Sequence, residues 1–434
     1  MVPEHSLSIW LEADQVGELT LEPAAESLTL HYTPKWQTSG FALSPCLPLT
    51  GSIKPADLQR FLRNLFPEGD SFEQLLDTYR ISRQNTFGLI RMLGSDTASG
   101  LTFLPGEQSG SEPPRFRPIS DAELIERLDK REQQGLIVWD AKPRLSVAGI
   151  QDKINVLLDA DGKPGFGEGS LCSTHILKFE HRQHTHLVLN EYVMMRLCEQ
   201  AGLPVAEVEL RRYGPHPALL VTRFDRQRIS QDQVRRLYVI DGCQALNLPP
   251  EYKYERNFGS GRDVLHIREG ASLPKLFALC QASAQPALDT KRLLDQVLFN
   301  LCINNHDAHG KNFSFFLNRQ GLRLTPAYDL VNIAMYPAFD QEMAMALGDE
   351  FDSYTVNAYQ LADFADSCRL PRKLVTNRLR VIGKALLKAL DTADFRDVIR
   401  SEAETRFVAA LLENVRERCQ HLLAEAGGIA GMKL

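Results

Sequence analysis

Asn305-His306-Asp307-Ala308-His309-Gly310-Lys311-Asn312 is the stretch on which the interpretation of the whole chain depends. It directly follows apolar residues spaced as on one face of a helix, from Leu293 to Leu301. A polar cluster next to an apolar helix must either face a cleft or be fully hydrogen-bonded. We therefore expect residues 305–312 to form a functional loop.

The spacing within this loop is that of a protein kinase. Asp307 and Asn312 fit the pattern D-x-x-x-x-N, in which the aspartate accepts the proton of the substrate hydroxyl and the asparagine binds Mg²⁺. Asp329 follows Asn312 by 17 residues and ends a strand-like run, where a kinase places its main metal carboxylate. One aspartate and one asparagine suffice, because Mg²⁺ takes its other oxygens from phosphate and water.

Two other interpretations of the loop stay open from the residues alone. It could simply cap the neighbouring helices and strands, or His306 and His309 could belong to a metal hydrolase. The second is weaker because no further histidine or cysteine cluster stands nearby. We expect His181, His184 and His186 to form a solvated turn rather than a metal site.

Residues upstream of the loop supply other groups that a kinase needs. Lys178 lies on an alternating strand, where a kinase places the lysine that neutralises the α- and β-phosphates. Glu191, early in the next helix, is its candidate partner, although the helix dipole also favours a glutamate there. The segment from Ser146 to Lys153 stands where a phosphate loop would, but it has one glycine, Gly149, and departs from G-x-G-x-x-G and Walker A. Its backbone N–H groups could still bind phosphate.

The front of the chain, residues 1–106, predicts a small α+β subdomain. Alternating apolar residues between 7 and 50 predict an antiparallel sheet, and apolar residues at helical spacing over 55–93 predict short amphipathic helices. The proline-, glycine- and serine-rich stretch 104–114 predicts a linker, so we place a domain boundary there.

Beyond the linker we expect a β-rich part, residues 107–265, and a mostly helical part, residues 266–434. The elements expected in them are a charged helix at 120–134, a hairpin of strands 146–158 and 175–180 around a glycine-rich turn (159–170), a helix at 190–201, strands at 205–210 and 218–224, a strand pair at 313–316 and 322–324, and tail helices over 360–426.

Composition excludes several classes of protein. With 44% hydrophobic and 24% charged residues, the 434-residue chain has ordinary globular usage. Its formal net charge of -6 at pH 7 excludes a globally basic nucleic-acid-binding protein. The run from Arg369 to Lys388 nevertheless has seven basic residues and no acidic one, which indicates either a solvated helix face or a site of phosphate contacts.

The sequence also predicts a cellular location. No segment resembles a signal peptide, and no stretch reaches the roughly 18 consecutive apolar residues of a membrane span. None of the eight cysteines stands in a C-x-x-C pair, so neither a zinc ribbon nor a disulfide framework is expected. We therefore expect a cytoplasmic protein with reduced, buried thiols and no membrane contact.

Taken together, the motifs resemble the HipA family, the serine/threonine-kinase toxins of bacterial type II toxin–antitoxin pairs. The motifs that carry the resemblance are SVAGIQDK (146–153), ILKFE (176–180), NE (190–191), GLPV (202–205), TRFDR (222–226), GCQAL (242–246), KYE (253–255), NHDAHGKN (305–312) and TPAYD (325–329), with PL (48–49), LFPEG (65–69) and LGSD (93–96) in the front part. They cover nearly the whole chain.

The resemblance implies a two-lobed, protein-kinase-like α+β fold with a β-rich N-lobe, a mostly helical C-lobe and an additional N-terminal α+β subdomain. ATP and Mg²⁺ are the implied cofactors. Asp307 matches the catalytic base, and Asn312 and Asp329 match the Mg²⁺ ligands. The implied ATP site consists of the phosphate loop (Ala148, Gly149, Ile150, Gln151, Asp152, Lys153), Lys178, the adenine-side hinge (Thr222, Arg223, Phe224), and His309, Gly310, Lys311, Asn312, Tyr328 and Asp329.

The family also implies partners and regulation. Its members phosphorylate glutamyl-tRNA synthetase and so halt translation, and a HipB-like helix-turn-helix antitoxin dimer neutralises them and represses their operon with them. Ser146 matches the serine whose autophosphorylation silences the kinase. A phosphoserine there would repel ATP phosphates because it carries about -1.5 to -2 charge. The alternatives are a small-molecule phosphotransferase and a kinase-like binding module without turnover.

Overall fold

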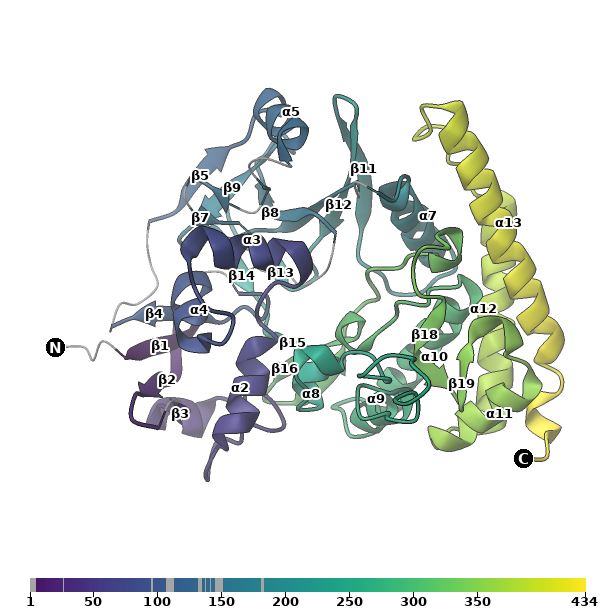
Figure 1. The fold of residues 1–434 in the computed structure, drawn as a ribbon, viewed down its shortest axis with the longest axis horizontal. Coiled ribbons are helices and arrows are strands. Elements are labelled where there is room, and N and C mark those ends of the chain that lie inside the picture. The colour runs from purple at the N-terminus through teal and green to yellow at the C-terminus, as the bar shows by residue number, and fades with distance from the viewer. Residues whose placement is uncertain are drawn as a thin grey trace. The chain divides into compact units, whose positions relative to one another are not determined.

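A computed structural model describes residues 5–25, 27–94, 97–106, 113–131, 135–136, 138–140, 142–144, 151–180 and 183–434 (Figure 1). The chain divides into two compact units. The first unit comprises Met1–Glu180, Arg211–Ile240 and Phe316–Gln320, and the second comprises His181–Leu210, Asp241–Phe315 and Gly321–Leu434.

The first unit begins with an antiparallel sheet and four helices. The strands are β1 (Ser6–Leu11), β2 (Asp14–Glu22), β3 (Ser27–Tyr32) and β4 (Thr102–Pro105), in the order β3-β2-β1-β4. The helices are α1 (Pro34–Ser39), α2 (Pro55–Arg63), α3 (Gly69–Tyr79) and α4 (Thr86–Leu93). Helix α2 buries Leu58, Phe61 and Leu62, which its three- and four-residue spacing places on one face. The sheet and the amphipathic helices expected from the sequence are confirmed.

A six-stranded sheet forms the rest of the first unit, in the order β11-β12-β10-β8-β9-β5. Its strands are β5 (Arg115–Pro118), β8 (Lys153–Leu158), β9 (Pro164–Glu168), β10 (His175–Phe179), β11 (Val208–Tyr213) and β12 (His216–Thr222). Two short hairpins accompany it, β6 (Val138–Trp139) with β7 (Lys142–Pro143) and β13 (Arg226–Arg228) with β14 (Val234–Arg236).

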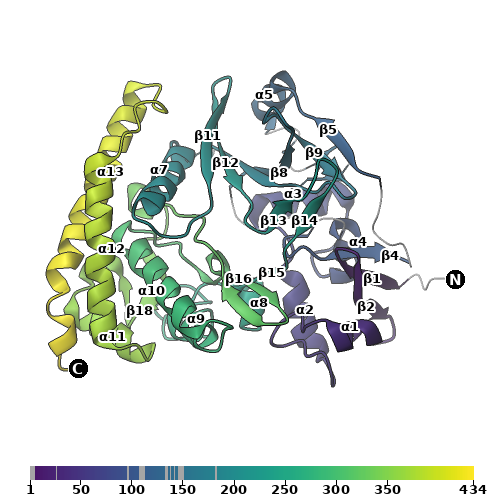
Figure 2. The same cartoon turned by 180° about the vertical axis from the view of Figure 1, so that it is seen from behind.

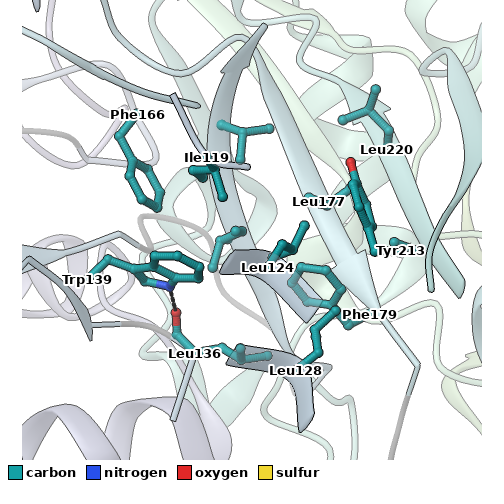
Figure 3. Close-up of a cluster of buried hydrophobic side chains, with 13 residues drawn as sticks. Ile119, Leu124, Leu128, Leu136, Trp139, Phe166, Leu177, Phe179, Tyr213 and Leu220 are labelled. Atoms are coloured by element: carbon teal, nitrogen blue, oxygen red, sulfur yellow. Dashed lines mark hydrogen bonds between the residues drawn. The ribbon is translucent and has the colours of Figure 1, made fainter. Parts of the chain in front are cut away.

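The core of this sheet lies under helix α5 (Asp121–Asp129), the charged helix that the sequence predicts. Leu124 and Leu128 of the helix pack with Leu177 and Phe179 of β10 in one apolar cluster (Figure 3). Trp139 joins the cluster and its indole N–H donates to the carbonyl of Leu136 at 2.6 Å, so its polar atom is satisfied within the apolar surroundings.

Three expectations for this sheet are wrong. The glycine-rich turn 159–170 is shorter than expected because it contains strand β9, which pairs with both β8 and β5. Strand β10 does not alternate, since Leu177, Lys178 and Phe179 are all buried. The two later strands run over 208–213 and 216–222, so both are displaced from the predicted ranges.

The second unit is mostly helical. Its helices are α7 (Leu187–Gln200), α8 (Gly242–Ala245), α9 (Leu273–Gln281), α10 (Pro286–Cys302), α11 (Ala358–Ser367), α12 (Arg372–Thr392) and α13 (Glu402–Glu425). Short 3₁₀ turns occur at Pro250–Tyr252, Gly310–Asn312, Ile333–Met335, Ser353–Thr355 and Ile429–Gly431. Helix α12 packs against α7, α10 and α13, and α12 and α13 run side by side (Figure 2). The predicted tail helices are confirmed.

Strands interrupt the helical part at two places. β15 (Val239–Asp241), β16 (Ser314–Asn318) and β17 (Gly321–Leu324) form a three-stranded sheet, and β16 and β17 confirm the predicted strand pair. β18 (Glu342–Leu347) pairs with β19 (Glu350–Asp352), a hairpin that the sequence did not indicate. A β-rich first unit and a mostly helical second unit confirm the predicted α+β class.

All eight cysteines are free thiols and seven of them are buried, as expected. Among the helices in the described ranges, none is both long and apolar enough to span a membrane.

Candidate active site

The loop 303–312 begins where α10 ends, at Cys302. Asn304 adopts a left-handed conformation (φ 51°) that turns the chain out of the helix. The backbone N–H of Ala344 in β18 donates to the carbonyl of His306 at 2.7 Å and ties the loop to that strand. Most of the loop is buried, whereas Asp307 is half-buried.

Tyr254 orients the carboxylate of Asp307. Its hydroxyl donates to Asp307 Oδ1 at 2.7 Å, and its ring lies edge-on to that of His309 with the centroids 5.3 Å apart. A hydrogen bond to a charged acceptor is among the stronger ones in proteins. The hydrogen bond uses one carboxylate oxygen, and a carboxylate is a group that can take up a proton in general base catalysis.

The predicted metal ligands lie together. Asn312 Nδ2 donates to Asp329 Oδ2 at 2.9 Å, although 17 residues separate them. Asp329 has a left-handed backbone (φ 58°), an uncommon conformation for a residue other than glycine and one that clusters at functional sites. Asn305 Nδ2 reaches the Asp329 carbonyl at 3.4 Å and Asn300 Oδ1 at 2.8 Å, and so links this segment to α10.

The donor set at this point suits Mg²⁺. Asn312 Oδ1 is buried without a hydrogen-bond partner, and a cation would satisfy it together with the Asp329 carboxylate. The described part of the chain holds no group of three or more histidine, cysteine, aspartate or glutamate side chains that could bind a metal. The alternative of a hydrolase metal site on His306 and His309 therefore finds no support there.

The remaining loop residues are held by close packing. Gly310 has no room for a side chain, because a Cβ would lie 2.4 Å from the Cβ of Ala271. Lys311 Nζ pairs with Asp241 Oδ2 at 3.1 Å in a buried ion pair. The hydroxyl of Tyr328 donates to the Lys311 carbonyl at 2.6 Å, and burial raises the pKa of this phenol. The ion pair of Lys311 and the hydrogen bond from Tyr328 thus stabilise the conformation of the loop.

His306 is the buried histidine of this loop. It is 3% exposed and its Nε2 lies 2.9 Å from Ser353 Oγ. Burial lowers the pKa of His306 to about 4, with a further contribution from the guanidinium of Arg418. The imidazole is therefore neutral at pH 7, and it acts as a structural group beside Asp307.

The first unit carries Lys178 on an inner strand. β10 lies between β12 and β8, and Lys178 is 6% exposed, so this lysine is buried on an inner strand of the sheet. Lys153 of β8 stands directly opposite and is 4% exposed. Directly opposed residues of antiparallel strands share one face, so both lysine side chains lie on the same face of the sheet.

The described end of the predicted phosphate loop runs beside β10. Gln151 Nε2 donates to the carbonyl of Phe179 at 2.8 Å, and the N–H of Phe179 donates to the carbonyl of Asp152 at 2.8 Å. Ser146, Ala148, Gly149 and Ile150 lie outside the described residues.

The predicted hinge ends strand β12. Arg223 is committed to a buried ion pair, donating from Nε and Nη2 to Asp225 at 3.0 and 2.8 Å. Burial opposes ionisation of Asp225, but Arg223 and Arg226 outweigh it and hold the pKa of Asp225 below its usual value. Phe224 packs edge-on against Phe316. The backbone of Arg223 is also engaged, because its N–H donates to the Thr174 carbonyl at 3.0 Å and its carbonyl accepts from the N–H of Arg226 at 3.3 Å.

Other predicted residues have different surroundings from those expected. Residues 183–186 form the expected turn, but His184 and His186 are half-buried in it: His184 packs against Phe339 with the centroids 4.1 Å apart, and His186 against Phe407 at 4.9 Å. His181 lies outside the described residues. Glu191 is buried within α7, at 1% exposure.

Ion pairs with aspartates neutralise part of the positive charge of the run from Arg369 to Lys388. Arg372 pairs with Asp366, six residues before it, at 2.6 Å, and Arg378 pairs with the sequence-distant Asp295 of α10 at 2.6 Å. The other basic side chains of the run (Arg369, Lys373, Arg380, Lys384 and Lys388) are exposed.

The chain is similar to known proteins along nearly its whole length. A model of the HipA N-terminal domain matches residues 7–104, and a model of the HipA-like C-terminal domain matches residues 145–390. The serine/threonine-protein kinase toxin HipA of Shewanella oneidensis is 43% identical over 410 residues, 94% of each chain. Putative kinase Y4mE of Sinorhizobium fredii is 32% identical over 402 residues, 89% of this chain and 93% of that protein.

A solved structure is also similar over the full length. The Shewanella oneidensis HipA chain, in a complex of HipA, HipB and operator DNA, superposes with a TM-score of 0.89 at 40% identity. The match covers 99% of this chain and 100% of that chain.

Proposed function

The chain belongs to the HipA family, and from this premise we propose that it is an ATP- and Mg²⁺-dependent serine/threonine protein kinase, the toxin of a bacterial toxin–antitoxin pair. One observation carries the proposal. Asn312, whose amide oxygen has no hydrogen-bond partner, bonds to Asp329 and lies on the same loop, 303–312, as the oriented carboxylate of Asp307.

The proposed chemistry is in-line transfer of the γ-phosphoryl group of ATP. Asp307 accepts the proton of a serine or threonine hydroxyl through Oδ2, the oxygen that Tyr254 does not bond. The hydroxyl oxygen then forms a bond to the γ-phosphorus while the bond between the γ-phosphorus and the leaving oxygen of ADP breaks. Asn312 and Asp329 would hold Mg²⁺, which would supply neutralisation of the β- and γ-phosphate charge.

The lysines of the first unit have a matching role in this proposal. Lys178 and Lys153 stand directly opposite each other on neighbouring strands and so share one face of the sheet. In this proposal Lys178 neutralises charge on the α- and β-phosphates of ATP, the role that its strand position gives it in kinases. The N–H groups of residues 148–153 and the hinge at 222–224 complete the proposed nucleotide contacts, together with residues 309–312 and Tyr328.

Substrate, regulation and partners follow from the family. We propose glutamyl-tRNA synthetase as the protein substrate, autophosphorylation of Ser146 as the silencing step, and a HipB-like helix-turn-helix antitoxin as the inhibitor, in a cytoplasmic complex that represses its operon. The solved relative is a complex with HipB and operator DNA, which supports this assignment. The exposed basic residues of α12 offer phosphate contacts to operator DNA.

We also propose that the chain consists of three parts: an N-terminal subdomain at residues 1–106, an N-lobe at 107–265 and a C-lobe at 266–434.

One experiment separates this proposal from its alternatives. Purified protein is incubated with γ-labelled ATP and Mg²⁺, first alone, then with glutamyl-tRNA synthetase, then with a panel of hydroxyl-bearing metabolites. We expect phosphoserine at Ser146 and on the synthetase, located by mass spectrometry. Label on metabolites alone would support the small-molecule phosphotransferase. Binding of Mg·ATP without any transfer would support the non-catalytic binding module.

A further inference from the structure

Helix α13 contacts both segments that carry the proposed chemistry. Asn414 Oδ1 accepts two hydrogen bonds, from Asn304 Nδ2 at 3.0 Å and from Asn332 Nδ2 at 2.8 Å. Asn304 precedes Asp307 by three residues and Asn332 follows Asp329 by three residues. A single oxygen of the C-terminal helix therefore joins the segment of the catalytic base to the segment of the metal ligand.

Both donors are deeply buried and have few alternatives. Asn304 is 1% exposed and Asn332 is 0% exposed. The two segments also touch directly, because the N–H of Ile333 donates to the Asn304 carbonyl at 3.0 Å. Asn190 of α7 exchanges a pair of 2.9 Å hydrogen bonds with the backbone of Asn332 and fixes that segment from another side. Asn414 thus completes a buried amide network.

Arg418, one turn further along α13, also forms hydrogen bonds to segments next to the catalytic loop. Its guanidinium donates to the Ser353 carbonyl and, at 3.4 Å, to the Leu301 carbonyl. Ser353 in turn contacts His306, the neighbour of Asp307, through its hydroxyl. The same side of α13 therefore supports the catalytic segment at two successive turns.

We propose that Asn414 is a positioning residue for phosphoryl transfer. By bonding to both segments, it fixes the position of Asp307 relative to Asp329. This inference rests on the proposed function. Asn414 lies beyond residue 390, where the match to the HipA-like C-terminal domain ends. Loss of its oxygen leaves two buried N–H groups unsatisfied, which is unfavourable enough to let the two segments shift apart.

The helix does not depend on Asn414 for its own packing. α13 buries Val408, Leu411, Val415, Cys419 and Leu422 along its apolar side, while Asn414 is only half-buried. Substituting Asn414 therefore removes no apolar core contact, and the expected effect is local to the two segments.

The test compares Asn414→Ala with Asn414→Asp. Alanine removes the acceptor, and we expect kcat for phosphoryl transfer to fall at least about ten-fold and the Mg²⁺ concentration for half-maximal rate to rise, with KM for ATP within about two-fold. Aspartate keeps oxygens that accept both N–H groups, so we expect it to retain most of the wild-type kcat. Gln420→Ala, at an exposed position on the same helix, is the matched control and should leave all three parameters unchanged.

Hydrogen exchange makes the inference testable apart from the proposed function. Peptides covering 303–313 and 329–335 should exchange faster in Asn414→Ala than in wild type and at wild-type rates in Asn414→Asp. Faster exchange in both peptides of Asn414→Ala supports the positioning role of Asn414, whether or not the wild-type protein transfers phosphate. Absence of phosphoryl transfer by the wild-type protein would overturn only the proposed function. Unchanged exchange, or an Asn414→Ala variant with wild-type kcat and Mg²⁺ dependence, would overturn the role of Asn414.

Discussion

Acidification should destabilise this protein through His306. Burial lowers the pKa of this imidazole from 6.5 to about 4, helped by Arg418 and opposed by Asp352, Gln341 and Asp340. In the unfolded chain the imidazole titrates near 6.5. Because the folded-state pKa is depressed, the contribution to stability is fully present above pH 6.5 and is lost as the pH falls towards 4.

The size of the effect follows from the two pKa values. At pH 5 the unfolded imidazole is almost fully protonated and the folded one is mostly neutral. This difference lowers the free energy of unfolding by about 2 kcal/mol relative to pH 7. The full loss, reached below pH 4, is about 3 kcal/mol.

Denaturant unfolding of His306→Gln tests this reasoning. Glutamine cannot gain a proton but places an amide near Ser353 Oγ, the partner of the imidazole. We expect wild type to lose about 2 kcal/mol more than His306→Gln between pH 7 and pH 5. His266→Gln, at an exposed position, should behave as wild type. Equal losses in wild type and His306→Gln would refute the buried neutral imidazole.

Three further substitutions probe the candidate active site. Lys178→Met removes one of the two buried ammonium groups on the sheet; we expect weaker binding of Mg·ATP by about ten-fold or more in calorimetry, with Lys373→Met as the unaffected exposed control. Asp329→Asn keeps a partner for Asn312 but removes the negative charge, so the half-saturating Mg²⁺ concentration should rise at least about ten-fold in a phosphoryl-transfer assay. Tyr254→Phe removes the hydroxyl that holds Asp307; kcat should fall about ten-fold in the same assay while KM for ATP stays within about two-fold. An unchanged kcat would show that the Tyr254 hydroxyl does not orient the base.

The elements that local spacing governs could be predicted from the sequence. The amphipathic helices of the front part and the tail have apolar residues at helical spacing, and Gly202 ends α7 with the left-handed backbone expected of such a stop. Strand β9 was missed because its glycines read as a turn. Gly165 and Gly167 are required by close packing instead, since a Cβ would lie 2.4 Å from the ring of Phe116 or 2.3 Å from the Leu171 carbonyl.

Some residues of the candidate site could be predicted from local spacing in the sequence, and others could not. Asp307, Asn312 and Asp329 are linked by spacing along the chain, so a kinase pattern could find them. Tyr254 lies 53 residues from Asp307, and Asn414 lies 110 residues from Asn304. Tertiary folding alone brings such partners together, although the KYE motif at 253–255 already marked the position of Tyr254. The burial of Lys178 likewise depends on strand order, which one strand's sequence does not specify.

Transfer of the γ-phosphate of ATP by wild type and by Asp307→Asn tests the central claim most directly. Asparagine preserves the acceptor for Tyr254 but cannot take up the proton of the substrate hydroxyl. We predict incorporation of phosphate by wild type and a rate lower by about 10²–10⁴-fold in Asp307→Asn, with Mg·ATP affinity within about two-fold. Full activity in Asp307→Asn would contradict the account.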